Sequence, residues 1–109
     1  VAEAYDEPLQ KLVVTPDVVA EVKHIYHQYV VLMKDFSERK NIMAHLEKKE
    51  VATGVYYPLP LHLQDCFSYL GYNEGAFPIA EGSSKRIMSL PIYSGVPEKE
   101  IISGVESYF

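Results

Sequence analysis

The stretch VYYPLPLHLQ, residues 55–64, holds the densest group of side chains that could contact a ligand. Tyr56 and Tyr57 are adjacent, His62 follows them, and two prolines stiffen the backbone in between. Phenol and imidazole groups can both form hydrogen bonds with a ligand. Because neighbouring residues of a strand face opposite ways, we expect one tyrosine in the core and the other open to solvent, a neighbouring domain or a ligand. Residue chemistry alone therefore leaves two interpretations of the stretch, a rigid part of the core or a surface that contacts a ligand.

Two further groupings could bind a metal or act on a substrate. His24 and His27 have the spacing HxxH, but residues three apart in a strand point to opposite faces and cannot share one ion. His62 and Cys66 stand four apart, which on one helix would place the imidazole beside the thiol. A cysteine nucleophile also needs an oxyanion hole and an orienting group, and no motif marks either. We expect no metal site and a small buried thiol, with a hydrolase built on Cys66 as a third hypothesis.

No motif supplies the rest of a catalytic site. Residues 71–77, GYNEGAF, match neither GxGxxG nor GxxxxGK[ST] and are predicted to form a loop. No lysine stands in a context typical of a Schiff-base nucleophile, and there is no nucleophile elbow or pair of carboxylates. We therefore predict no catalytic residue, and the chain by itself is expected to be inactive.

The composition argues against several classes of protein. The 109 residues suffice for one domain with one hydrophobic core. The net charge of -5 argues against a general nucleic-acid binder. No apolar run approaches the roughly 20 residues of a membrane-spanning helix. Cys66 is the only cysteine, which excludes an intramolecular disulfide and favours a reducing, cytoplasmic location.

The elements expected to position these residues form a small α+β domain. Residues 1–7 are predicted to be a helix closed by Pro8, and we interpret this helix as the end of a longer one. Asp35 followed by Glu38 matches a capping box at a helix start. The patterns predict strands at 24–33, 52–58 and 87–90, and helices at 36–50, 63–70, 79–86 and from 97 onward. This order predicts a small sheet of about three strands with helices packed on one face.

Two glycines are predicted to adopt special backbone conformations, and two leucines are predicted to be buried. Gly54 lies within the second predicted strand and is interpreted as a bulge. Gly71 follows the short predicted helix, where a helix end favours a residue with positive φ. Leu61 and Leu63 flank His62 and are expected to pack into the protein.

The order of these landmarks resembles the C-terminal small domain of the DegT/DnrJ-type nucleotide-sugar aminotransferases, which are pyridoxal-phosphate enzymes of fold type I. AEAYDEPL is similar to the family's linking helix, and HIYHQYVV to its first small-domain strand. TGVYYPLPLHLQ resembles the family's most specific motif, and FPIAEGSSKRIMSLPIY resembles its FPxAExxxxxxLSLPxY segment. The likeness covers nearly all of residues 1–109, which we take as one small domain with residues 1–8 as the end of the interdomain helix.

The resemblance implies a function for a longer parent protein. Such an enzyme passes an amino group from glutamate or glutamine to pyridoxal phosphate and then to a keto-sugar nucleotide, in pathways such as polysaccharide biosynthesis. The Schiff-base lysine, the acid at the pyridine nitrogen and the phosphate loop belong to the N-terminal large domain, so this segment should bind no cofactor alone. A homodimer is also implied.

The resemblance also implies contacts at the substrate cleft, for which we select Tyr56, Tyr57, His62 and Gln28. Many members of the family have a His-Tyr pair where this chain has Tyr56 and Tyr57. A phenol can donate a hydrogen bond but carries no positive charge at neutral pH, so Tyr56 should bind substrate without acid-base chemistry. The alternative is a non-catalytic interaction or regulatory module derived from such an enzyme.

Overall fold

Two short antiparallel strands form the sheet and present one face to the core. The computed structural model describes residues 1–109, with β1 at Tyr29–Leu32 and β2 at Ile87–Leu90. Tyr29 lies opposite Leu90 and Val31 opposite Met88, and all four side chains are buried. Because side chains alternate along a strand, these four share one face of the sheet.

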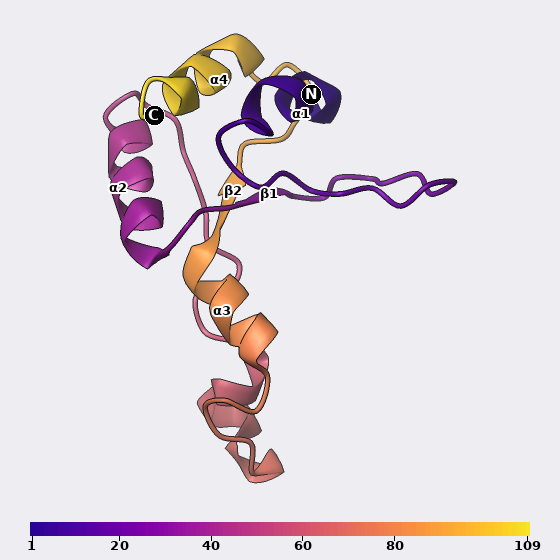
Figure 1. The fold of residues 1–109 in the computed structure, drawn as a ribbon, viewed down its shortest axis with the longest axis vertical. Helices are drawn as coiled ribbons and strands as arrows, with labels where there is room; N and C mark the ends of the chain where they lie inside the picture. The colour runs from indigo at the N-terminus through magenta and orange to yellow at the C-terminus, as the bar shows by residue number, and fades with distance from the viewer.

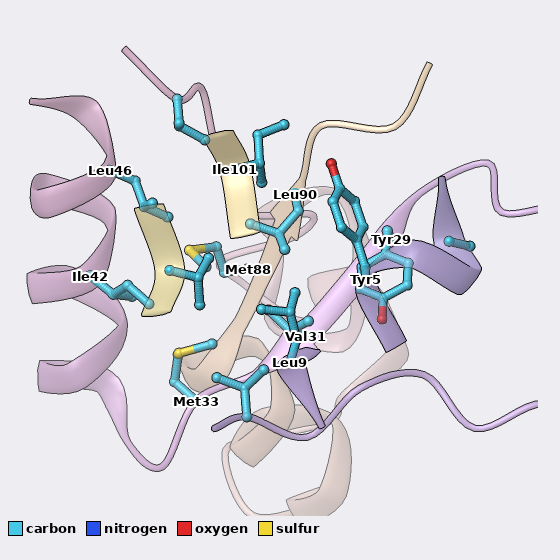
Figure 2. Packing of buried hydrophobic residues seen from close by; sticks show 14 of the residues in the cluster. Tyr5, Leu9, Tyr29, Val31, Met33, Ile42, Leu46, Met88, Leu90 and Ile101 are labelled. Atoms are coloured by element: carbon cyan, nitrogen blue, oxygen red, sulfur yellow. The ribbon is translucent and has the colours of Figure 1, made fainter. Parts of the chain in front are cut away.

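Three helices cover this face. They are α1 (Ala2–Leu9), α2 (Phe36–Glu47) and α4 (Glu98–Glu106), which gather around one end of the sheet (Figure 1). Figure 2 shows side chains from all three helices pointing toward Val31 and Met88. Fully burying one such aliphatic side chain contributes about 1.5–3 kcal/mol. The helical contributions to the core are Ala2, Tyr5, Leu9, Ile42, Leu46, Ile101 and Val105. The α+β class, with helices on one face, is confirmed.

The sheet has two strands, so the prediction of about three was slightly too high. The second predicted strand, residues 52–58, is reduced to one bridge between Gly54 and Ser89 on the outer edge of β2. Pro58 and Pro60 have no backbone N–H to donate to a ladder, which keeps the chain beyond Tyr57 from continuing the pairing. On the outer edge of β1 a second bridge joins Val14 to Leu32.

The first predicted strand was too long, because only its second half pairs. Residues 15–28 instead leave the sheet as an extended arm that doubles back to β1 (Figure 1). Val19, Val22 and Ile25 are exposed on this arm. β-branched residues favour extended backbone, but a strand also needs a hydrogen-bonded partner. The two limbs of the arm run alongside each other (Figure 1), yet away from the turn at the tip no backbone hydrogen bond joins one limb to the other.

The capping box at the start of α2 is confirmed. Asp35 accepts a hydrogen bond from the backbone N–H of Glu38 at 2.9 Å. The Glu38 carboxylate accepts from the backbone N–H of Lys34 at 2.7 Å, one residue earlier than the usual partner. The helix ends at Glu47 and not at the predicted Glu50, which adopts a left-handed φ of 60°.

The bounds of the remaining helices agree closely with the sequence-based predictions except at residues 63–70. α1 continues one residue past Pro8, whereas α3 (Pro78–Arg86), β2 and α4 lie within a residue of the predicted bounds. The predicted helix at 63–70 is two 3₁₀ helices, η1 (Leu61–Leu63) and η2 (Asp65–Leu70), separated by an extended Gln64. Gly71 ends η2 with a φ of 73°, as predicted. No helix combines the length and the hydropathy needed to cross a bilayer.

Candidate functional site

The candidate site is a hollow of about 430 Å³ between residues 56–62 and α3. Tyr56, Tyr57 and His62 all line it, so the structure brings these three predicted residues together. The wall is mainly apolar with a few polar groups, which is typical of sites for small molecules. The other lining residues are Leu59, Pro60, Leu61, Phe77, Ala80, Ser83, Ser84 and Ile87.

Both tyrosines point out of the core. Tyr56 is 51% exposed and Tyr57 64% exposed, and their rings meet edge-on with centroids 6.1 Å apart. The prediction that one of them would be buried was wrong, because this segment is not a strand and the alternation argument does not apply to it. Leu61 is also exposed, contrary to expectation, while Leu63 is half-buried.

Gly54 fixes the start of this segment. Its N–H donates to the Ser89 carbonyl at 3.1 Å, and the Ser89 N–H donates back at 2.7 Å. Gly54 is therefore a paired residue, and its interpretation as a bulge was wrong. A Cβ at position 54 would lie 2.7 Å from Cε2 of Tyr56, so the Tyr56 ring lies directly over this glycine.

Glu81 anchors the other end of the segment. Its carboxylate is 2.8 Å from Nε2 of His62 and accepts hydrogen bonds from the N–H groups of Gly75 and Phe77 at 2.9 and 3.1 Å. The N–H of Gly75 first, then the N–H of Phe77 and the His62 side chain, hold the pKa of the Glu81 carboxyl below its usual value, although burial opposes them. The side chains of His62 and Glu81 are each only 9% exposed.

Sequence reasoning missed Glu81. Its position in the first turn of α3 was a signal, since acids there accept from free N–H groups, but nothing in the sequence indicated that His62 would reach it. Aromatic contacts reinforce the same junction. The Phe77 ring packs edge-on against His62 at 4.8 Å and against Tyr72 at 5.0 Å between centroids.

Gln28 lies in a second hollow of about 470 Å³ on the other side of Tyr56. The structure thus separates Gln28 from Tyr57 and His62, and Tyr56 alone lines both hollows. This second hollow is more polar than the first, and its lining offers hydrogen-bond donors and acceptors but no lysine, arginine or carboxylate side chain. Its remaining lining residues are His27, Ala52, Thr53, Gly54, Ser89, Leu90, Pro91 and Ile92.

The histidine and cysteine groupings give no reactive pair. Cys66 is exposed, so its assignment as a buried thiol was wrong, and its sulfur contacts the Gln64 side chain at 3.9 Å. His62 bonds Glu81, and the break at Gln64 removes the single helix that would have placed His62 beside Cys66. His24 accepts from the backbone N–H of Tyr26 at 2.9 Å.

Residues 1–107 match the DegT/DnrJ/EryC1/StrS aminotransferase family. A pleiotropic regulatory protein of Geobacillus stearothermophilus is 42% identical over 95 residues, which cover 87% of this chain and 25% of that protein. A dTDP-3-amino-3,6-dideoxy-alpha-D-galactopyranose transaminase of Aneurinibacillus thermoaerophilus is 30% identical over 92 residues, covering 84% of this chain and 24% of that protein.

A solved structure gives the same result. A DegT DnrJ EryC1 StrS aminotransferase from Brucella abortus superposes with a TM-score of 0.85 at 28% identity, over 98% of this chain and 29% of that one. The chain therefore spans only 24–29% of the length of these relatives. On the family match over residues 1–107, this chain belongs to the DegT/DnrJ/EryC1/StrS aminotransferase family.

Proposed function

We propose that this chain is part of a longer pyridoxal-phosphate-dependent aminotransferase that transfers an amino group from glutamate or glutamine to a keto-sugar nucleotide. Family membership supports the proposal, as does the similarity to a relative named as a sugar transaminase. The observation that carries it is local. Tyr56, Tyr57 and His62, from the segment that resembles the family's most specific motif, line one hollow beside α3.

The role we assign to this segment is one wall of the substrate cleft. Phenol, imidazole and amide groups match the hydroxyl and ring oxygen atoms of a sugar. Tyr56, Tyr57 and His62 offer such groups in the first hollow, and Gln28 offers one in the second. Tyr56 contributes to both, so we place it at the centre of the contact surface.

The residues around Tyr56 do not fit pyridoxal phosphate. This cofactor needs a lysine for its aldehyde and a carboxylate or similar partner for its pyridine nitrogen. Neither a lysine nor an aspartate or glutamate lines the two hollows. We assign the cofactor to the part of the longer protein outside this chain, and expect the segment alone to be inactive.

We also propose that residues 1–8 end an interdomain helix and that the whole enzyme is a homodimer. Exposed apolar side chains, with Ile25 86% and Ile79 85% exposed, support contacts with further protein surface. A segment expressed alone should self-associate through such surface. Sedimentation of a strictly monomeric species at high concentration would count against this arrangement.

The test uses the full-length protein and a panel of keto-sugar nucleotides. Loss of one hydrogen bond at a substrate atom weakens binding by roughly 2- to 10-fold, so Tyr56→Phe and His62→Ala should raise KM by about that factor. Tyr69→Phe is the matched control, because Tyr69 is 78% exposed and lines neither hollow. If KM and kcat were unchanged for every accepted nucleotide sugar, the site assignment would be wrong.

A second candidate function is a regulatory protein that keeps the fold without the chemistry. The printed name of the Geobacillus relative, a pleiotropic regulatory protein at 42% identity, favours it. The discriminating measurement is the visible absorbance of a lysine-bound cofactor in the full-length protein, together with amino transfer to a keto-sugar nucleotide. Both signals support the enzyme, and their joint absence supports the regulatory module.

A further inference from the structure

We propose that Glu81 is a positioning residue, which acts through His62 to hold residues 55–62 against α3 and so sets the shape of the hollow beside Tyr56. This inference deepens the proposed function, and its kinetic test rests on that function. The argument starts from the Glu81 carboxylate, which joins separate segments of the chain. It bonds the His62 side chain and the backbone N–H groups of Gly75 and Phe77.

The Glu81 carboxylate has hydrogen-bond partners for its buried oxygen atoms where it lies. A buried carboxylate needs hydrogen-bond donors, and the His62 ring and the two backbone N–H groups supply them here. Glu81 also lies in the first turn of α3, where its negative charge meets the positive end of the helix dipole. Glu81 is held by α3 and by the N–H groups of Gly75 and Phe77. Its bond to His62 therefore positions the segment that carries His62.

Two sets of hydrogen bonds, which we call ties, attach residues 54–62 to β2 and α3 at the two ends of the hollow. At one end the backbone of Gly54 is bonded to Ser89 of β2 by two hydrogen bonds. At the other end His62 is bonded to Glu81 of α3. Between these ties both tyrosines of the segment are exposed, so little burial holds them in place. Loss of the second tie should release one end of the wall while the fold of the core, which lies on the other elements, persists.

The kinetic test compares four single variants and one double variant of the full-length protein. Glu81→Ala removes the tie, Glu81→Gln keeps a hydrogen-bonding group of the same length, and His62→Phe keeps the ring that packs on Phe77 but loses the hydrogen bond. The control is Glu38→Ala, which removes an acid that accepts a backbone N–H at the start of α2, away from both hollows.

Glu81→Ala should raise KM for the keto-sugar nucleotide roughly tenfold while leaving KM for the amino donor within about twofold. Glu81→Gln should recover most of the loss. The double variant Glu81→Ala, His62→Phe should raise KM by less than the product of the two single effects, because both changes break the same tie. Glu38→Ala should reduce stability without changing either KM. Equal changes in both KM values, or no change in either, would overturn the proposal.

A second measurement does not depend on enzyme activity. Hydrogen–deuterium exchange of the full-length protein should show faster exchange over residues 55–64 in Glu81→Ala but not in Glu38→Ala. A role limited to capping α3 would speed exchange only over residues 72–86, and this result would overturn the proposal. If the unmodified protein transfers no amino group, the proposed function fails, while the exchange experiment still decides the role of Glu81.

Discussion

The ring of Tyr56 lies over Gly54, so that a Cβ at position 54 would come within 2.7 Å of the ring. Any side chain at this position must displace the tyrosine, because the glycine backbone is held by two hydrogen bonds to Ser89. Tyr56, the main candidate for contact with a ligand, therefore keeps its position partly because residue 54 has no Cβ.

Gly54→Ala tests this relationship. The φ of Gly54 is not in the left-handed region, so alanine adds no backbone strain and the exposed ring should move instead. We expect a stability change of less than about 1 kcal/mol but a several-fold rise in KM for the nucleotide sugar. In a Tyr56→Ala background the same change should have no further effect on KM, and an additive effect would contradict the contact.

The hydroxyl of Tyr29 donates to the Asp6 carboxylate at 2.5 Å and joins β1 to α1. Tyr29 is fully buried, and a hydrogen bond to a charged group contributes about 1.5–3 kcal/mol. Tyr29→Phe should therefore lower the free energy of unfolding by about 2 kcal/mol in urea titrations. Tyr26→Phe is the control, since Tyr26 stacks on Tyr29 through its ring and that ring is kept. Equal losses of unfolding free energy in the two variants would show that the hydrogen bond from Tyr29 to Asp6 makes no extra contribution to stability.

Alkaline pH should destabilise the protein through Tyr5. Burial, followed by the charge of Glu98, raises the pKa of Tyr5 to about 12 from its usual 10. The folded state thus keeps a proton that the unfolded state loses, so stability is intact below pH 10 and falls between pH 10 and about 12. The slope is up to about 1.4 kcal/mol per pH unit. Urea titrations across this range should show a flatter profile for Tyr5→Phe.

Two helical glycines should respond differently to alanine. At Gly82 in α3 nothing lies within 4 Å of an added Cβ, so Gly82→Ala should stabilise by about 0.5–1 kcal/mol through helix propensity. At Gly104 in α4 the added Cβ would lie 3.1 Å from Cδ2 of Leu46, and this crowding should cancel the same gain. Gly104→Val should destabilise by about 1–3 kcal/mol. Thermal unfolding of the three variants checks the order.

Features that depend on neighbouring residues in the chain could be predicted from the sequence. Asp35 and Glu38 form the capping interaction expected of their spacing, and Gly71 has the positive φ expected at a helical end. α3 and α4 begin close to prolines that favour helix starts. In each case the physical cause lies within a few residues of the effect.

Features that depend on distant partners could not be predicted. The arm has strand composition, but away from its tip no backbone hydrogen bond joins its two limbs. Whether Leu61 or Cys66 is buried depends on which elements pack nearby. The pairing of His62 with Glu81 joins residues 19 apart across a loop, and no local pattern encodes it. The grouping of Tyr56, Tyr57 and His62 at one site was expected from the family resemblance, whereas the separate location of Gln28 was not.

Residues 55–61 are attached to the fold at both ends, through Gly54 and through His62, so we expect this segment to tolerate replacement as a unit. A segment fixed at both ends can take a new sequence without changing where it enters or leaves the fold. Transplanting the equivalent segment from a relative, while keeping Gly54, His62, Ser89 and Glu81, should transfer that relative's preference among nucleotide sugars. Under the proposed function, a single short graft should therefore be enough to change sugar selectivity.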